Sequence, residues 1–448
     1  MRLLTGVTLI CGGLILPTAA AAFEAPESDI DIDHTWTITW NEAVDVDTAE
    51  AAIQIIDEDD SAHDISVQPV DGTPEAVQVI PLTDYEPNRT YTLTVDETAA
   101  SADGTAMDET ITHPFETETV TWETADHVDG DWVRTDSFET WEAAREQVDE
   151  HDAILQDEEV VWAHEGTAVT GAAVTNIYPT KNLASGGGAI TYVAGHTTME
   201  LLSAGEDWVE VEISGAHGYT PAAAVELRPE VTKPNRSYYK NNNGELYHYI
   251  HRAAGYDGAY HYGPAPDFLD EGERAYSTDG INFGEDMYEH PYTFKDITEP
   301  TDLDEDDFDD IFAEHRPDAP LREGIEYFFK AEDKHDTNAF YLLTHAIHES
   351  SWGESMIAEE KNNFFGINAV DSNPFENATT YESMKDGVIE GAAFISNGYL
   401  DENDWRYEGP FPGFKGAGMN VRYASDPYWG QKMAGFMYRL SEAVDDDE

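Results

Sequence analysis

Hydrophobic and polar residues alternate in short runs along the first quarter of the chain. Residues 35–40, 52–56, 77–80 and 90–95 show the two-residue period of strands that bury one face. Asp-Gly pairs, which favour tight turns, separate several of these runs. This pattern predicts an antiparallel β-sandwich over residues 23–118.

The middle of the chain carries more varied patterns. Residues 119–159 predict a linker with a short helix near 138–148, and residues 160–230 return to short alternating strands, which predicts a small β domain. Residues 231–320 are rich in Tyr, His, Gly and Asn and end in an acidic run. We therefore predict a loop-rich connecting region with short strands at 231–320.

The last third of the chain changes to the period of helices. Residues 339–343 are apolar on every side, which is typical of a buried helix. The polar cluster at 336–338 can accept the first free helical N–H groups, and the helix is expected to end near Gly353. Residues 321–442 therefore predict a compact domain built around this helix, with an acidic tail at 443–448.

Two short strands are expected inside this domain, at 366–370 and 378–381, on either side of a turn that contains Asn-Pro. A helix is expected to begin at Ser383, which has an acidic residue three positions on, as in a capping box. A last helix follows Asp426 and Pro427, because proline fits the first helical position. The order of helix, β-hairpin and helices predicts an α+β domain.

Residues 1–22 have the features of a secretory signal. Arg2 supplies a positive start, residues 3–16 are largely apolar, and three alanines at 20–22 offer a cleavage site. The single cysteine, Cys11, lies inside this segment, so we expect a mature chain without disulfides or thiolate metal sites. No later stretch is apolar enough to cross a bilayer. These features predict a secreted, extracellular protein.

The charge balance is strongly acidic. The chain has 92 Asp and Glu against 23 Lys and Arg, a formal net charge of −69. Such a surface repels phosphate backbones, which argues against a nucleic-acid partner. Because 40% of the residues are hydrophobic, we interpret the charge as a solvated coat on packed domains and not as disorder. High salt screens repulsion within such a coat, so we predict a protein adapted to a saline or alkaline medium.

Glu349 is the strongest candidate for chemistry. It falls in the last turn of the predicted buried helix, where one side of its carboxyl is desolvated and the other is reachable. Desolvation disfavours the anion and raises the pKa of a carboxyl, which suits a general acid near neutral pH. A lone glutamate at a helix end more often caps or pairs with a neighbour. His345 lies one turn earlier on the same face and could hold the carboxyl.

A zinc site is the alternative for the cluster of His345, His348 and Glu349. Catalytic zinc needs three protein ligands, and the HExxH order is absent from this chain. No other motif in the sequence indicates a zinc ligand from a distant part of the chain. We therefore predict neither a metal nor a cofactor.

The segments NAFYLLTHAIHESSWGESMIAEEKNNFFGINAVDSNPF and KGAGMNVRYASDPYWGQKMAGFMYRL carry a resemblance that spans residues 321–442. They are similar to the catalytic domain of the bacterial endo-β-N-acetylglucosaminidases of glycoside hydrolase family 73, autolysins that cut peptidoglycan. The likeness extends loosely upstream to about residue 135. It implies a lysozyme-like α+β fold with a helical lobe, a small β-lobe and a groove between them.

Two further resemblances concern the β-rich regions. The segments ITWNEAVD, PLTDYEPNRTYTLTV and ASADGTAM resemble bacterial Ig-like domains, which implies a spacer or binding role for residues 23–118. Residues 191–220 resemble a bacterial SH3-like barrel, a family that often contacts wall peptides. For residues 160–230 a structural spacer is an equally good interpretation.

The glucosaminidase resemblance places the family's general acid at Glu349 and supports Tyr423 as a second functional residue. A second carboxyl is less defined: Asp371, Glu376 and Asp426 are candidates, and a route assisted by the acetamido group of the substrate needs none. Of the three, we expect Asp371 to be catalytic together with Glu349 and Tyr423. The candidate substrate-binding residues are His345, Ser350, Trp352, Asn363, Phe365, Gly366, Trp405, Asp426 and Tyr428.

The resemblance implies a secreted, monomeric peptidoglycan hydrolase that is extracellular or associated with the cell wall. It would cut the β-1,4 bond between N-acetylglucosamine and N-acetylmuramic acid, with Glu349 as the acid. A muramidase or lytic transglycosylase on the same fold would cut the other glycosidic bond. A wall-binding protein without catalysis is the alternative from another class, against which the intact HxES, NNFFG and YASDPYWG segments argue.

Overall fold

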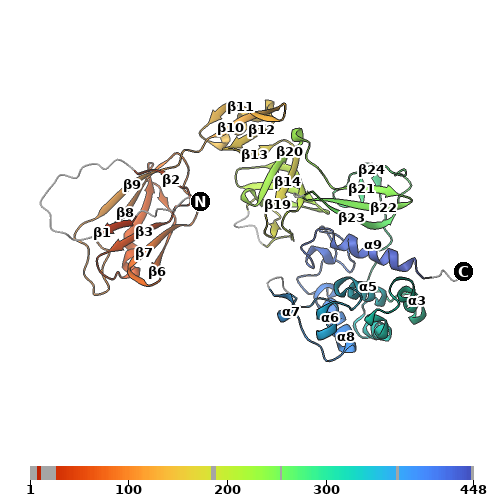
Figure 1. The fold of residues 1–448 in the computed structure, drawn as a ribbon. Coiled ribbons are helices and arrows are strands. Elements are labelled where there is room, and N and C mark those ends of the chain that lie inside the picture. Colours follow the sequence, from red (N-terminus) through yellow and green to blue (C-terminus); the bar gives the residue numbers. More distant parts are fainter. Residues whose placement is uncertain (1–7, 12–26, 183–187, 253–254, 370–372, 445–448) are drawn as a thin grey trace. The chain divides into compact units, whose positions relative to one another are not determined.

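The computed structural model describes residues 8–11, 27–182, 188–252, 255–369 and 373–444 (Figure 1). The chain divides into two compact units, Met1–Glu123 with Asp136–Glu146 and Thr124–Thr135 with Gln147–Glu448. Most of the predicted signal segment lies outside the described residues.

The first unit is a sandwich of two sheets, as its alternating sequence predicts. Along β3 (Trp36–Trp40) every second side chain is buried, so that Trp36, Ile38 and Trp40 enter the core. The strand β8 (Thr90–Val95) alternates in the same way. One sheet has the order β1-β3-β7-β6 and the other β2-β9-β8-β4-β5. The remaining elements are β1 (Thr8–Cys11), β2 (Glu27–Ile30), α1 (Val46–Ala52), β4 (Ile53–Asp57), β5 (Ala62–His63), β6 (Ile65–Val70), β7 (Thr73–Pro81) and β9 (Ile111–Thr117).

The region predicted as a linker contains more than its helix. The predicted helix is α2 (Trp141–Gln147), and four strands form a sheet in the order β11-β10-β12-β13. Its strands are β10 (Trp122–Val128), β11 (Asp131–Phe138), β12 (Ala153–Gln156) and β13 (Glu159–Ala163).

A five-stranded antiparallel sheet follows, with the order β19-β18-β17-β14-β20, and beside it lies the hairpin β15-β16. This is the segment predicted to be SH3-like, and that closer assignment stays a prediction. The strands are β14 (Gly166–Thr170), β15 (Thr175–Ile177), β16 (Thr191–Val193), β17 (Thr198–Ala204), β18 (Trp208–Ile213), β19 (Ala216–Pro221) and β20 (Val225–Pro229).

The region predicted as loop-rich is an ordered sheet with the order β23-β22-β21-β24. Its tyrosines fill a small core instead of lying in loops: Tyr239 and Tyr262 are fully buried, together with Leu246. The strands are β21 (Tyr238–Asn242), β22 (Glu245–Arg252), β23 (Gly255–Pro264) and β24 (Arg274–Ala275), followed by the small hairpin of β25 (Asn282–Phe283) and β26 (Asp286–Met287).

The C-terminal helices pack around α5 (Ala339–Ser350), which is buried on nearly every side. Its N-cap is Asn338, whose side chain accepts the N–H of Tyr341, as the polar cluster predicts. Its C-cap is Ser351, two residues before the predicted end. The other helices are α3 (Glu305–His315), α4 (Ile325–His335), α6 (Met356–Lys361), α7 (Pro374–Asn377), α8 (Met384–Ile395) and α9 (Trp429–Ser441).

The two strands predicted inside this domain are wrong for the residues that the structure describes. Residues 367–368 form a turn, and residues 378–381 are not paired as a strand. The buried side chain of Asn363 joins the two segments instead, because its amide donates to the carbonyls of Ile367 and Thr379, at 2.9 and 3.1 Å. One backbone bond, from Thr379 to Ile367, completes the link at 3.1 Å.

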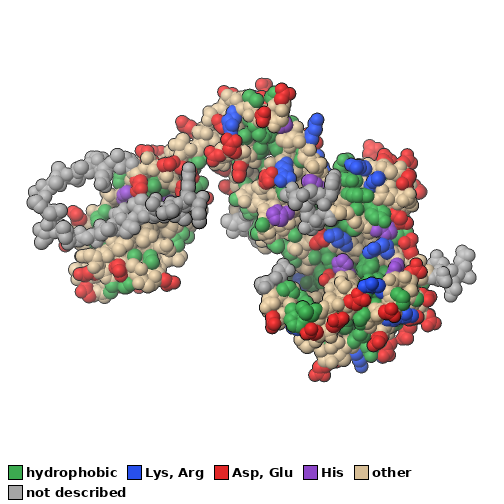
Figure 2. Space-filling model, in the orientation of Figure 1, with side chains coloured by type: hydrophobic (Ala, Val, Ile, Leu, Met, Phe, Trp, Pro, Cys, Tyr) green, Lys and Arg blue, Asp and Glu red, His purple; other side chains and the backbone are tan. Residues whose placement is uncertain are grey.

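Asp and Glu side chains are spread over the face seen in Figure 2, as the acidic composition leads one to expect. Among the described residues no helix is long and apolar enough to span a membrane.

Candidate active site

Glu349 lies one residue before the end of α5, and its carboxyl is the centre of the candidate site. The Glu349 side chain is 28% exposed, whereas His345, one turn earlier, is completely buried. Burial raises the pKa of Glu349, and a hydrogen bond from Trp429 opposes that rise. The carboxyl is therefore both reachable and inclined to keep its proton, as the sequence predicts.

Three groups surround the carboxyl. The indole Nε1 of Trp429 donates to Oε1 of Glu349 at 3.4 Å, and Nε2 of His345 lies 3.8 Å from the same oxygen. Gly366 approaches the other oxygen: a Cβ at this position would lie 3.7 Å from Oε2. Because Gly366 also has a φ of 65°, it lets the chain turn beside the carboxyl where a larger residue would be strained.

His345 is a neutral partner of Glu349. Its burial lowers the pKa of the imidazole to about 3, so it carries no charge at neutral pH. The hydroxyl of Tyr341 lies 3.0 Å from Nδ1 of His345. If that hydroxyl donates to Nδ1, the ring proton is on Nε2 and points to Glu349. If it donates to Sδ of Met419, which is 3.2 Å away, Nδ1 carries the proton and Nε2 is an acceptor. Nε2 has no closer partner among the described residues.

Aromatic rings form the wall beside the carboxyl. Tyr423 stacks on Trp429 with ring centres 4.5 Å apart and lies edge-on to His345 at 5.0 Å. Tyr399 packs behind Tyr423 at 5.1 Å. Burial, with Glu349 as the next contribution, raises the pKa of Tyr423 well above its ordinary value. Tyr423 is therefore a neutral hydroxyl close to Glu349, which can donate a hydrogen bond but does not act as a base.

Other predicted substrate-binding residues divide into two groups. Phe365 joins the site, with its ring 5.5 Å from His345. Ser350 makes internal bonds at the helix end, to the carbonyl of Ala346 at 2.5 Å and from the N–H of Gly353 at 2.8 Å. Asn363 is occupied by the loop that it holds, and Trp352 packs on Phe312 and Phe436.

The remaining candidates lie further along the chain. Trp405 is 74% exposed and lies 5.8 Å from the guanidinium of Arg422, next to Tyr423 in sequence. Asp426 accepts the N–H of Tyr428 at 2.9 Å and forms an ion pair with Lys432. Tyr428 is buried and contacts the ring of His248.

These contacts do not identify a second carboxyl group that could act with Glu349. Asp371 lies outside the described residues. Glu376 is exposed on the short helix α7. The Asp426 carboxylate is already bound by the backbone N–H of Tyr428 and by the side chain of Lys432. Among the described residues no group of three or more His, Cys, Asp and Glu side chains could hold a metal ion.

Tyr341, which contacts His345, is a residue of the candidate site that the sequence analysis did not predict. It is four residues before His345, which places it one helical turn back on the same face. Tyr341, His345 and Glu349 are four residues apart, a spacing that places all three on one face of the helix. Tyr341 lies in an apolar run, however, and such a run predicts only burial.

Comparison with known families decides what this region is. The family model described as mannosyl-glycoprotein endo-beta-N-acetylglucosaminidase matches residues 325–442. These residues form a glucosaminidase domain. A bacterial Ig-like domain model matches residues 19–117, in agreement with the sandwich of the first unit. The resemblance noted for both segments is confirmed.

Curated relatives agree with the glucosaminidase domain. A protein of Streptococcus pneumoniae, provisionally named endo-beta-N-acetylglucosaminidase, is 36% identical over 235 residues, which is 52% of this chain and 34% of the relative. A beta-N-acetylglucosaminidase of Bacillus subtilis is 28% identical over 131 residues, 26% of this chain and 15% of the relative. The chain thus spans about a third of the pneumococcal protein.

Among solved structures, a catalytic mutant of Staphylococcus aureus autolysin E in complex with the disaccharide NAG-NAM is similar, at 23% identity and a TM-score of 0.28. The match covers 39% of this chain and 82% of that one.

Proposed function

We propose that the chain is a secreted peptidoglycan hydrolase that cuts the β-1,4 bond after N-acetylglucosamine, with Glu349 as the general acid. The observation that best supports this proposal is that the Glu349 carboxyl is reachable, has a raised pKa and lies within a glucosaminidase domain. Protonated Glu349 would give its proton to the glycosidic oxygen as the C–O bond breaks, and positive charge would develop at the anomeric carbon.

The neighbours of Glu349 have distinct proposed roles. Trp429 and His345 hold the carboxyl, and the neutral imidazole avoids a full positive charge that would favour the carboxylate. Tyr423 positions a water molecule or the acetamido group by donating its hydroxyl hydrogen. Asp371 remains a proposed second carboxyl for the route in which a base activates water.

The bond is tested by the reducing ends released from purified peptidoglycan. Glucosamine-type reducing ends support the proposed bond, whereas muramic or anhydro-muramic ends would assign the chain to the muramidase or lytic transglycosylase alternative. Binding to the wall without release of reducing sugar would favour the non-catalytic alternative.

The pH dependence of activity follows from the pKa of Glu349. Only the protonated form is a general acid, so kcat/KM should fall as pH rises through the pKa of Glu349, which burial places above its ordinary value of 4.5. A profile of kcat/KM against pH on soluble glycan fragments measures this limb. A fall centred at or below 4.5 would contradict the raised pKa.

Replacement of Tyr423 by Phe should lower kcat by roughly 100-fold, the usual loss when one preorganised donor at the reacting centre is removed. Phe keeps the stacking on Trp429 and the edge contact with His345, so the fold should be preserved. Steady-state kinetics should show a smaller change in KM. Tyr327→Phe, on α4 away from the site, is the matched control, and equal kinetics for both variants would remove Tyr423 from the mechanism.

A further inference from the structure

The imidazole of His345 is enclosed by aromatic rings and presents one buried nitrogen to Glu349. The enclosing rings, with centres 5.0–5.5 Å from that of the imidazole, are those of Tyr341, Phe365, Tyr423 and Trp429. The His345 side chain is completely buried, and its Nε2 lies 3.8 Å from Oε1 of Glu349 without a hydrogen-bond partner among the described residues. A buried polar atom without a partner is costly, so its presence beside the candidate acid points to a use in the reaction.

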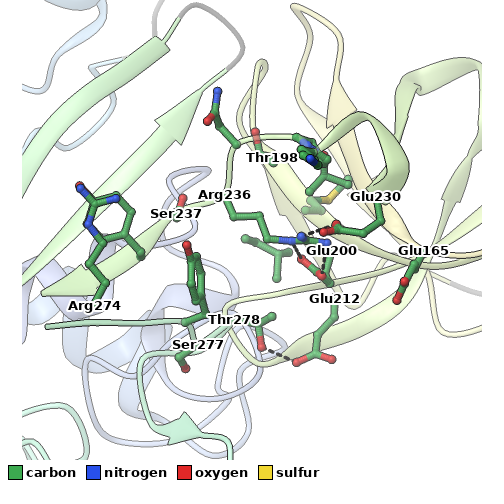
Figure 3. A pocket seen from close by; sticks show the side chains of 18 of the residues that line it. Glu165, Thr198, Glu200, Glu212, Glu230, Arg236, Ser237, Arg274, Ser277 and Thr278 are labelled. Atoms are coloured by element: carbon green, nitrogen blue, oxygen red, sulfur yellow. Dashed lines mark hydrogen bonds and ion pairs between the residues drawn. The ribbon is translucent and has the colours of Figure 1, made fainter. Parts of the chain in front are cut away.

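The distances around Glu349 are long for hydrogen bonds to a carboxylate. In the cleft shown in Figure 3, the carboxylate of Glu212 accepts the hydroxyl of Thr278 at 2.5 Å. At Glu349, by contrast, Nε1 of Trp429 and Nε2 of His345 lie 3.4 and 3.8 Å from Oε1, beyond the roughly 2.7–3.2 Å of an ordinary N–H···O bond. Hydrogen bonds to catalytic groups are often long in the unliganded enzyme and shorten only in the transition state.

Tyr341 determines which nitrogen of His345 carries the ring proton. Its hydroxyl lies 3.0 Å from Nδ1 of His345 and 3.2 Å from Sδ of Met419. An imidazole nitrogen is a stronger acceptor than a thioether sulfur, so the hydroxyl donates to Nδ1. Because burial lowers the pKa of His345 to about 3, the ring is neutral and holds a single proton, which then lies on Nε2 and faces Glu349.

We propose that His345 is a positioning residue that binds the Glu349 carboxylate as it forms, and that Tyr341 makes this possible by keeping the ring proton on Nε2. This role rests on the proposed function of Glu349 as the general acid. Oε1 faces His345 and Trp429, so the proton leaves from Oε2 to the glycosidic oxygen, which also takes the electron pair of the breaking C–O bond. The negative charge left behind spreads over both carboxylate oxygens, and Nε2 donates to Oε1 while it keeps its own proton.

Such a bond accelerates the reaction because it is stronger after the proton has left. A hydrogen bond to a carboxylate is about twice as strong as one to a neutral carboxyl. An interaction that strengthens only in the transition state raises kcat and leaves substrate binding almost unchanged. The same bond favours the carboxylate of Glu349, so its loss should raise the pKa of this residue further.

The other titratable groups around this pair do not produce the same effect. Burial raises the pKa of Tyr341, Tyr399 and Tyr423, so their hydroxyls stay neutral. Burial lowers the pKa of His348, on which three charged groups act: Lys432, Asp426 and Arg439. Residues 363–369, which include Phe365 and Gly366, contribute no titratable side chain. The titration of His348 is common to the wild type and to a variant of Tyr341, so it cancels when the two are compared.

The first test is the replacement of Tyr341 by Phe in the full chain. We expect kcat on soluble glycan fragments to fall about tenfold, the loss of one hydrogen bond to a charged group, with little change in KM. The fall of kcat/KM with pH should also move to higher pH. Tyr262→Phe removes a buried hydroxyl 3.1 Å from Oγ1 of Thr293, far along the chain, and as the matched control should change neither. A loss of kcat without the shift in pH, or no loss at all, would overturn the proposal.

A double-mutant cycle tests whether Tyr341 acts through His345. Glutamine at position 345 can present an amide N–H to Glu349 without any choice of tautomer. In the His345→Gln background, Tyr341→Phe should therefore produce no further shift of the pH profile. An equal shift in both backgrounds would show that Tyr341 acts on Glu349 by another path and would overturn the proposal.

The tautomer itself can be measured on the wild type by nitrogen NMR of ¹⁵N-labelled histidine side chains. The chain has 16 histidines, and comparison with His345→Gln identifies the signals of His345. We expect a protonated Nε2 and an unprotonated Nδ1 at neutral pH; a proton on Nδ1 would overturn the proposal. This measurement needs no substrate, so it is independent of whether Glu349 is the acid, which the activity of Glu349→Gln decides separately.

Discussion

Glu349→Gln should lower the rate of glycan hydrolysis by about 10²- to 10⁴-fold, the range expected when a general acid is removed. Glutamine has the same shape and can accept the hydrogen bond of Trp429, but it has no proton to give to the leaving oxygen. Release of reducing sugar from purified peptidoglycan at high salt measures the loss. Glu360→Gln, an exposed glutamate on α6, is the matched control and should keep full activity.

The same substitution should stabilise the protein at neutral pH. The pKa of Glu349 is higher in the folded than in the unfolded chain, so the folded state binds the extra proton between the two values. The free energy of unfolding of the wild type therefore falls as pH rises through that interval, and glutamine does not share the fall. Thermal melts should show a higher Tm for the variant at pH 7 and equal values below pH 4.5.

A combined result separates catalysis from folding. Lost activity together with an unchanged or higher Tm at pH 7 would assign the loss to the missing proton. Full activity of the variant would show that Glu349 is not the acid, and the site would have to be sought elsewhere. Lost activity with a lower Tm would leave the raised pKa of Glu349 without support.

Local sequence signals were sufficient for the elements that depend on neighbours in the chain. The alternation around Trp36 and Ile38 predicts a strand because period two is a property of the backbone itself. The cap of α5 at Asn338 and the reachable position of Glu349 follow from the polar cluster at 336–338 and the apolar run at 339–343.

Contacts between residues far apart in the chain could not be predicted from the sequence. Tyr239 and Tyr260 lie in the region that we predicted to be loops. A tyrosine is usually buried only where its hydroxyl has a hydrogen-bond partner, and the local sequence does not show such a partner. That partner is Gln431, which is 192 residues from Tyr239 and 171 from Tyr260. Likewise, no pattern in the sequence shows that the amide of Asn363 replaces a pair of strands, or that Trp429 reaches Glu349.

The helix α9 explains why the glucosaminidase domain is expected to depend on the sheet of β21 to β24. One face of α9 enters the helical core through Met433 and Met437. Its other face meets β23 so closely that a Cβ on Gly435 would lie 2.5 Å from the carbonyl oxygen of His261. A helix buried on both sides cannot leave one neighbour without exposing apolar surface.

Gln431 holds that second face by three hydrogen bonds, of which those with Tyr239 and Asp279 are buried and that with Tyr260 is partly buried. Its Oε1 accepts the hydroxyls of Tyr239 and Tyr260 at 3.0 and 2.7 Å, and its Nε2 donates to the carbonyl of Asp279 at 2.6 Å. Leucine at this position would leave the Tyr239 hydroxyl and the Asp279 carbonyl without this partner, whereas the Tyr260 hydroxyl would keep its contact with Nδ1 of His248 at 2.8 Å. Each such group costs roughly 1–3 kcal/mol.

The loop that carries Tyr423 is held by hydrogen bonds from strand β16. Thr191 donates to the carbonyl of Val421 at 2.8 Å, and Tyr192 donates to the carbonyl of Arg422 at 3.0 Å. The buried amine of Lys415 ties the loop from inside by donating to the carbonyls of Asn420 and Ala424. Two residues of the candidate site, Tyr423 and Trp429, therefore depend on strands upstream of the glucosaminidase domain.

We expect a fragment of residues 321–448 to show no cooperative unfolding transition and no hydrolysis, whereas a fragment of residues 119–448 should show both. In the full chain, Gln431→Leu should lower the free energy of unfolding of the second unit by about 3 kcal/mol or more. Denaturant titration followed by tryptophan fluorescence measures both effects, with Gln147→Leu, at an exposed position, as the control. A fragment of residues 321–448 that unfolds cooperatively and hydrolyses glycan would show that the upstream sheets are attached to an independent enzyme.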